Sequence, residues 1–298
     1  MWTQTFENKV LNAFNDAFTT TLLNVRVPNS SNKPLRVGYH DGRKNYVHML
    51  CNKKKKTIGK RDWFFYPTLV TEKCDKKWKS VIIGGELRPE LQSAIFSDDY
   101  NLSTYAQNYT VCVETTKASY MINSYAFSGS GYTGTSLQRA KTNAQLMGYA
   151  FVLQSVDIGT NWQVNITLSN NGVASFYYPI FPYLKFSPGK TKLLLTDISL
   201  QGINALPGTN ITFSIQINQS VFADISSDTF VDLIIGVKSP YAFSSNPVKL
   251  CNKNASADGS IIISNAFYVS DNSVTSAYWK PNFDVTLLCL YATALMWW

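Results

Sequence analysis

The sequence predicts an N-terminal α/β region followed by an all-β region that forms an antiparallel β-sandwich. Three observations lead to this prediction. The chain has 298 residues, which is enough for two domains. Patterns typical of helices alternate with patterns typical of strands up to about residue 157. From about residue 158 apolar residues recur with period two, and turn signals multiply.

In the first region, apolar residues three or four positions apart predict a helix over about 3–17. Strands are predicted at 21–27, 35–40, 78–84 and 149–153, and helices at 89–96, 105–115 and 136–147. Because strands that alternate with helices favour parallel pairing, we expect a parallel sheet here.

In the second region, Trp162, Val164, Ile166 and Leu168 alternate with polar residues before the turn signal at 170–172. Comparable runs lie at 192–198, 210–217, 229–237, 248–250 and 260–269. Short strands at this spacing are typical of a sandwich. We therefore expect one domain at 1–157 and a second at 158–270.

Residues 271–298 form a C-terminal tail whose last fourteen residues, 285–298, carry no charge. This run is too short for a spanning helix. Three interpretations stay open: a final buried strand, a lipid-anchor signal, or the product of a wrongly predicted gene end. Apart from the anchor, we expect no association with a membrane.

The basic residues are concentrated in one segment of the chain. The net charge is +8, and residues 43–79 carry twelve Lys or Arg against three acidic residues. A nucleic-acid-binding protein usually spreads basic residues over a face or along a helix, so we expect no specific nucleic acid as partner. The segment can be a solvated loop, a polyanion-binding loop or a nuclear-localisation signal. Polyanion binding would use Lys53, Lys54, Lys55 and Lys56.

Cysteine and asparagine usage gives limited information on the compartment. The five cysteines show no C-x-x-C spacing, and the only histidines are His40 and His48, so the pattern does not favour a zinc site. Seven N-x-S/T sequons are weak support for secretion. The first eighteen residues do not predict a signal peptide, because Glu7 and Asp16 interrupt them.

Motifs for cofactor or nucleophile chemistry are absent from the sequence. There is no G-x-S-x-G, no phosphate-binding G-x-x-x-x-G-K-[ST], and no G-x-G-x-x-G after a strand. We therefore expect no cofactor and no metal.

Three segments are similar to motifs of one family: VGYHD at 37–41, IGGE at 83–86 and LMGYAFVL at 146–153. They resemble the motifs G-[YF]-H-N-D, V-G-G-E and L-G-Y-R-F-V-L of the family called domain of unknown function 4832. Weaker matches are SYMIN at 119–123, to a helix motif S-Y-L-N, and NGVA at 171–174, to N-G-F-A. The ordered set spans about residues 2–250.

The resemblance implies a secreted glycoside hydrolase with a (β/α) barrel followed by a β-sandwich, and therefore an extracellular location. The family carries three or four strands and a G-x-W-G-E segment before the point where this chain begins. The resemblance thus implies that the chain holds only part of a barrel, either as a fragment or as a degenerate copy of a family member. The chain departs from the motifs where Asp41 directly follows His40 and where Ala150 replaces an arginine.

Two carboxylates are the candidate catalytic residues, because the C-terminal ends of barrel strands line the active site. Asp41 and Glu86 occupy such positions. Sugar hydrolysis needs one protonated and one ionised carboxyl, so Glu86 would be the nucleophile or the general acid. The alternative is that Glu86 stabilises the start of the helix near Pro89.

Five further residues are candidates for substrate binding: His40, Arg26, Trp63, Tyr66 and Asn123. His40 can hydrogen-bond sugar hydroxyls, and Arg26 can orient a carboxylate. A core histidine and a structural ion pair are the competing interpretations. Trp63 and Tyr66 can stack on sugar rings, or they can pack the loop that carries them against the barrel. Asn123 is a candidate because it is the last residue of the segment matched to S-Y-L-N.

These observations favour a carbohydrate-active, glycoside-hydrolase-like protein, active or inactive. The alternative function is non-catalytic binding of glycans or polyanions through the sandwich and the basic segment 43–79.

Overall fold

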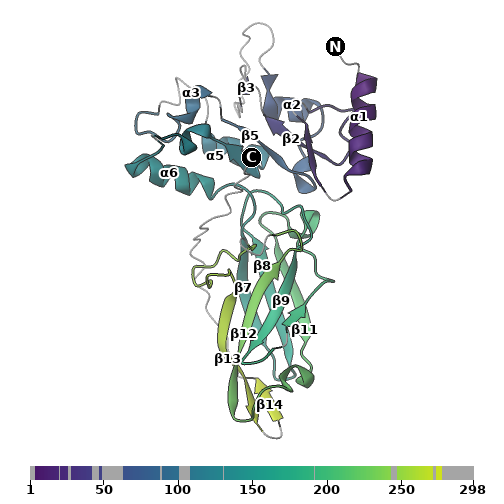
Figure 1. Ribbon diagram of the computed structural model, residues 1–298, viewed down its shortest axis with the longest axis vertical. Coiled ribbons are helices and arrows are strands. Elements are labelled where there is room, and N and C mark those ends of the chain that lie inside the picture. The colour runs from purple at the N-terminus through teal and green to yellow at the C-terminus, as the bar shows by residue number, and fades with distance from the viewer. Residues whose placement is uncertain are drawn as a thin grey trace. The chain divides into compact units, whose positions relative to one another are not determined.

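The computed structural model describes residues 4–19, 21–25, 28–41, 47–48, 63–87, 89–100, 108–129, 131–190, 192–242, 247–270 and 273–276. The chain divides into two compact units. The first runs up to Gly148 and includes Val173–Ser175, and the second holds Tyr149–Gly172 and the described chain from Phe176 on. Figure 1 labels the helices and strands of both units.

A parallel sheet forms the centre of the first unit. Its strands are β1 (Leu23–Val25), β2 (Val37–Asp41), β5 (Ile83–Glu86) and β6 (Tyr120–Ile122), in the order β1-β2-β5-β6. All three neighbouring pairs are parallel. A short parallel pair, β3 (Val47–His48) with β4 (Trp63–Phe64), lies outside this sheet. The predicted parallel sheet is thus confirmed.

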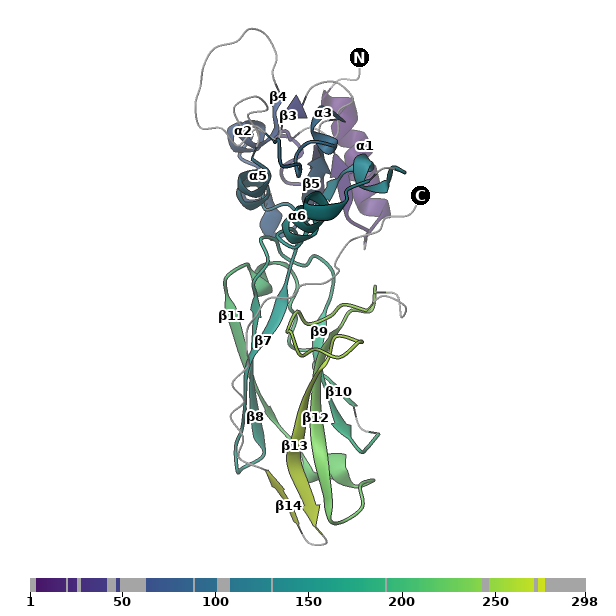
Figure 2. The same cartoon turned by 90° about the vertical axis from the view of Figure 1, so that its left-hand side faces the viewer.

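Helices connect these strands. They are α1 (Gln4–Ala17), α2 (Phe65–Thr71), α3 (Pro89–Gln92), α5 (Tyr109–Thr116) and α6 (Gly134–Ala144), with 3₁₀ turns η1 (Lys77–Lys79) and η2 (Ser124–Phe127). In α5 the side chain of Asn108 accepts a hydrogen bond from the Val111 amide (3.0 Å), and Lys117 ends the helix in the left-handed conformation. Helices α2 and α5 lie against the same side of the sheet (Figure 2).

The core of the first unit lies between the sheet and these helices. Tyr39 and Ile83 of the sheet are fully buried, and they belong to one cluster with Leu69 of α2 and Val113 of α5. Since successive residues of a strand point to opposite faces, the alternate residues of β2 and β5 face away from this core.

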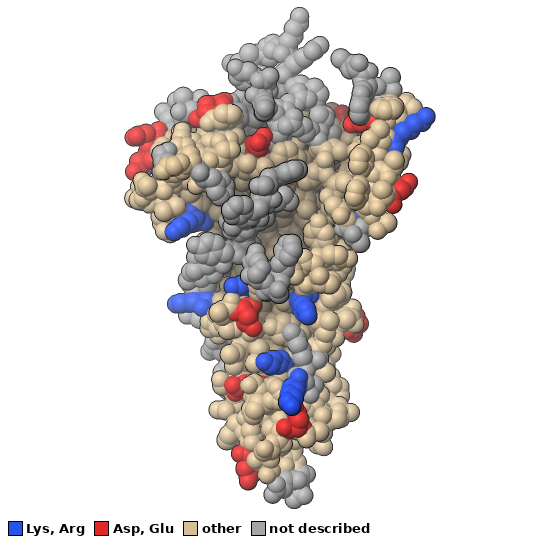
Figure 3. Space-filling view, in the orientation of Figure 1, with Lys and Arg blue, Asp and Glu red and all other residues tan. Residues whose placement is uncertain are grey.

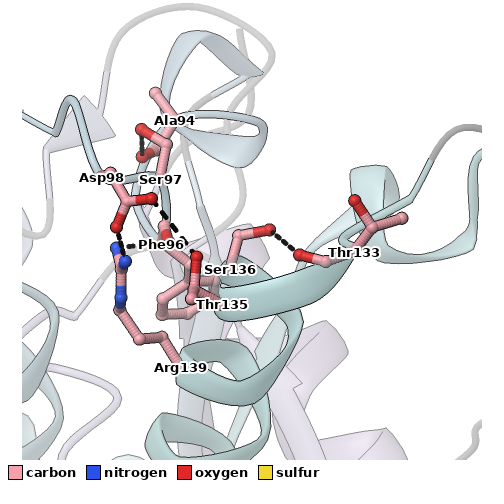
Figure 4. A network of polar contacts seen from close by, with 8 residues as sticks. All are labelled: Ala94, Phe96, Ser97, Asp98, Thr133, Thr135, Ser136 and Arg139. Carbon is pink, nitrogen blue, oxygen red and sulfur yellow. Dashed lines mark hydrogen bonds and ion pairs between the residues drawn. The ribbon is translucent and has the colours of Figure 1, made fainter.

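Polar contacts join α6 to the turn that follows α3 (Figure 4). Arg139 forms an ion pair with Asp98 and donates to the carbonyl of Phe96 (3.0 Å), while the Thr135 hydroxyl donates to Asp98 (3.2 Å). The Asp98 side chain is 72% exposed, so the ion pair itself contributes little stability. The contacts attach α6 to this turn.

Two antiparallel sheets form the second unit, one on each side of its core (Figure 2). The smaller has the order β11-β8-β7 and the larger the order β10-β9-β12-β13-β14. The strands are β7 (Phe151–Ile158), β8 (Gln163–Asn170), β9 (Phe181–Ser187), β10 (Lys192–Leu194), β11 (Asn210–Gln216), β12 (Thr229–Lys238), β13 (Ile261–Ser270) and β14 (Ser273–Ser276). The 3₁₀ turns η3 (Gly202–Ala205) and η4 (Gln219–Phe222) lie in the connections.

Alternating residues of the two sheets fill the sandwich core. Ile166 and Leu168 of β8 are fully buried together with Leu184 of β9 and Leu233 of β12. Trp162 stacks on Phe267 with ring centroids 6.1 Å apart. The period-two prediction for this region is therefore confirmed.

Several predictions differ from the structure. The strand predicted at 78–84 begins in the 3₁₀ turn η1, and β5 itself starts at Ile83. SYMIN, matched to a helix motif, contains strand β6, and 248–250 is not a strand. The predicted boundary at 157/158 falls at the end of β7, whose antiparallel partner is β8, so the first sandwich strand begins before that boundary. The four described strands of the parallel sheet are half the number in a closed barrel, and the barrel stays a prediction.

Asn252 attaches the segment after β12 to the edge of the smaller sheet. It is almost fully buried, and its side chain accepts from the Leu153 amide and donates to the Leu153 carbonyl, both at 2.9 Å. Strand β7 is at the edge of this sheet, so its outer backbone groups have no partner strand, and Asn252 pairs with those of Leu153.

Asn252→Ala should lower the free energy of unfolding by about 2–4 kcal/mol, because two buried backbone groups lose their partners. Urea unfolding of the full chain measures the change. Asn254→Ala, on an exposed residue of the same turn, is the matched control and should stay within about 0.5 kcal/mol of the wild type. Equal effects of the two substitutions would contradict the role of Asn252.

Candidate functional site

The register of the parallel sheet places four polar residues on one face. Asn24 is paired with Gly38, and His40, Gly84 and Tyr120 are paired across β2, β5 and β6. Glu86 is two residues beyond Gly84, so it belongs to the same face, about 6.6 Å along the strand. The opposite face holds Val25, Tyr39, Ile83 and Met121, which pack in the core. The polar residues thus share the face away from α2 and α5.

Two glycines make room for the polar side chains. A Cβ atom at Gly84 would overlap the Tyr120 ring, and one at Gly38 would overlap the Asn24 side-chain oxygen and the carbonyl of Ile82. The side chains of Tyr120 and Asn24 therefore lie across the neighbouring strands. Glycine within a strand often marks such a close approach.

Hydrogen bonds connect three of these side chains. The Tyr120 hydroxyl lies 2.7 Å from Nδ1 of His40, and Asn24 Nδ2 donates to the same hydroxyl at 3.3 Å. The His40 and Tyr120 rings are nearly parallel, 13° apart, with centroids separated by 5.8 Å. Three strands thus contribute to one connected group.

Burial raises the pKa of Tyr120 to about 12, and the negative charge of Glu86 acts in the same direction, whereas the hydrogen bond from Asn24 opposes it. The phenol is therefore protonated at neutral pH and has a proton to donate. Glu86 and Tyr120 belong to the same face of the neighbouring strands β5 and β6. Glu86 itself is half-buried at the end of β5.

The candidate carboxylate pair, Asp41 and Glu86, is not supported by the register. Asp41 is paired with Gly85, the residue before Glu86. Positions 41 and 86 therefore belong to opposite alternation classes of the sheet. The side chain of Asp41 lies outside the described residues.

The other candidate residues have different places. Arg26 and the side chain of Trp63 lie outside the described residues, as do Lys53–Lys56. Tyr66 of α2 packs against the helix-covered core. Asn123 donates to the Tyr132 hydroxyl (2.7 Å) and accepts from the Tyr125 amide (3.1 Å), so its side chain is engaged in capping η2. Of the five, the structure brings His40 to the same face as Glu86.

Lys77, a described lysine of the basic segment, is held by contacts within the first unit. Lys77 donates to the Leu35 carbonyl (2.7 Å) and lies over the Tyr39 ring, 5.2 Å from its centroid. Burial lowers the pKa of Lys77 to about 8, with the Cys74 thiol acting in the opposite direction. On the face seen in Figure 3, described basic residues lie among acidic ones without a patch of one sign.

A scan against protein-family models and searches of curated proteins and of solved structures each gave no match. The resemblance to the domain of unknown function 4832 therefore stays a prediction. Within the described residues, no group of three or more His, Cys, Asp or Glu is placed to hold a metal ion. No helix of the described chain has the length and apolar character needed to cross a bilayer.

Asn24 and Tyr120 were not predicted from the sequence as site residues. The available signal was glycine at positions 38 and 84 inside predicted strands, since a glycine there indicates that another side chain approaches the backbone. The residues that approach could not be identified without the register.

Gly84→Ala should displace the Tyr120 ring and lower the free energy of unfolding by about 1–3 kcal/mol, as other overpacking substitutions do. Urea unfolding measures the loss. Gly129→Ala is the control, because nothing lies within 4 Å of a Cβ built at Gly129. A Gly84→Ala variant as stable as Gly129→Ala would show that the ring moves aside without cost.

Proposed function

We propose that the polar face of the parallel sheet is a carbohydrate-binding site of a glycoside-hydrolase-like protein. The single observation that supports this is the gathering of Asn24, His40, Tyr120 and Glu86 on the face away from the helices. In a (β/α) barrel that face is the interior, and sites lie at the C-terminal ends of its strands. A barrel-like closure and an extracellular location belong to the same proposal.

The chemistry of these groups suits a ligand rich in hydroxyls. An amide, an imidazole and a phenol form one hydrogen-bonded group, and the carboxylate of Glu86 belongs to the same face, so the face offers both donors and acceptors. A sugar hydroxyl both donates and accepts, so it can pair with each of them. Glu86 is the strongest acceptor of the four, because hydrogen bonds to a carboxylate are charge-assisted.

Hydrolysis requires a second carboxyl on the other side of the glycosidic bond, roughly 5–9.5 Å from the first. Glu86 is the one carboxylate that the register assigns to this face among the described residues. Binding through Glu86 is therefore the primary proposal. Glu86 would serve as nucleophile or general acid where a second carboxyl faces it.

Glu86→Gln should weaken oligosaccharide binding by about tenfold, because a charge-assisted hydrogen bond is replaced by a neutral one. Calorimetric titration of the full chain against a panel of neutral oligosaccharides measures the affinity. Glu114→Gln, at an exposed position of α5, is the control and should bind as the wild type does.

Two outcomes of that experiment would contradict the proposal. One is the absence of binding across the panel, and the other is equal binding by Glu86→Gln and the wild type. The same proteins are assayed on aryl glycosides. Turnover that disappears in Glu86→Gln would make Glu86 a catalytic residue, whereas turnover that survives would remove it from the mechanism.

A second candidate function, glycan binding by the sandwich, is favoured by an aromatic pair on the outer face of the larger sheet. Phe230 is 56% exposed and directly opposite Tyr268 in the register, with ring centroids 5.0 Å apart. The Tyr268 hydroxyl donates to Asp228 at 2.8 Å, which holds the ring in place. An exposed phenylalanine beside a fixed, half-buried tyrosine ring can stack on the apolar face of a sugar ring.

Phe230→Ala should weaken binding of soluble polysaccharides by about tenfold if the pair is a sugar platform. Affinity electrophoresis of the full chain measures this. Ile203→Ala removes an apolar side chain that is 68% exposed on η3 of the same unit, and it should have no effect. Unchanged retardation of Phe230→Ala would exclude the platform.

A further inference from the structure

The contact between Tyr120 and His40 can be made in two ways. With 2.7 Å between the hydroxyl oxygen and Nδ1, one of the two atoms must carry the shared proton. If the phenol donates, Nδ1 is unprotonated, and a neutral imidazole then carries its proton on Nε2. If Nδ1 donates, the phenol accepts and its own proton must point elsewhere.

Asn24 distinguishes these two arrangements. Its Nδ2 donates to the Tyr120 hydroxyl oxygen, while its carbonyl oxygen lies against the backbone at Gly38. The hydroxyl oxygen could also accept a bond from Nδ1, but the proton of the largely buried phenol would then have no acceptor among the described residues. The His40 nitrogen at 2.7 Å is the acceptor that the structure offers it.

We propose that Tyr120 is a positioning residue that holds His40 as the neutral tautomer protonated on Nε2. Asn24 orients the phenol, and Gly84 provides the space in which its ring lies. His40 is then a hydrogen-bond donor through Nε2, with a ring plane set by Tyr120. That this donor serves a sugar hydroxyl rests on the proposed function, whereas the tautomer itself does not.

The chain is well suited to a direct test because it contains two histidines, His40 and His48. Full-length protein labelled with the heavy nitrogen isotope in histidine, carrying His48→Gln, gives the signals of one imidazole. Long-range proton–nitrogen correlation at neutral pH reports which ring nitrogen is protonated. We expect protonated Nε2 and unprotonated, hydrogen-bonded Nδ1. A protonated Nδ1 would overturn the proposal.

Tyr120→Phe removes the donated proton and keeps the ring, so the Nδ1 signal should move toward that of an imidazole without this bond. Tyr125→Phe, elsewhere in the same unit, is the matched control and should leave the His40 signals unchanged. An unchanged Nδ1 signal in Tyr120→Phe would also overturn the proposal. If Tyr120→Phe does not fold, Asn24→Ala tests the same arrangement, because loss of the amide donor should let Nδ1 become partly protonated.

Carbohydrate titration then separates this inference from the proposed function. Tyr120→Phe should weaken oligosaccharide binding by about tenfold relative to Tyr125→Phe. The expected tautomer without sugar binding by the wild type would overturn the proposed function and leave the positioning role standing. Sugar binding by the wild type together with a protonated Nδ1 would overturn the positioning role and leave the proposed function standing.

Discussion

The alternation of side chains in the parallel sheet is the constraint on which the first unit depends. One alternation class, with Tyr39 and Ile83, is buried beneath the helices and holds the sheet to them. The other class is thereby directed away from the core, and it contains the polar residues and the glycines. A shift of one residue in the register would exchange the two classes, so the same apolar packing that stabilises the unit also positions the candidate site.

A second set of contacts holds the side of β2 that faces the core. The Tyr39 hydroxyl donates to Asn32 at 2.8 Å and lies 3.1 Å from the Cys74 sulfur, while Lys77 covers the ring. Burial raises the pKa of Tyr39, and the Cys74 thiol adds to the effect, so its hydroxyl remains a donor. These contacts attach two loops to the strand that carries His40. The ring of His40 is consequently held through its backbone as well as through Tyr120.

Sequence patterns predicted the elements whose signals are local. The apolar spacing of 3–17 predicted α1, and the alternation from Trp162 predicted β8. Strand β6 was assigned to a helix through the family resemblance, and its three residues are too few to show a strand period that would have corrected the assignment. Glu86 and His40 were identified from the ends of predicted strands. That Asp41 and Glu86 belong to opposite alternation classes could not be predicted, because it depends on pairing between strands far apart in the sequence.

The close approach of Tyr120 to Gly84 has a consequence for how this sequence can diverge. A side chain at position 84 and a large ring at position 120 exclude each other, as do a side chain at 38 and the present placement of Asn24. Substitutions at these positions are therefore coupled: a descendant that gains a side chain at 84 is expected to replace the tyrosine at 120 with a smaller residue. Such paired changes would be visible as covariation between positions 36 residues apart, and they would mark the loss of the polar group from the sheet before any change in the core.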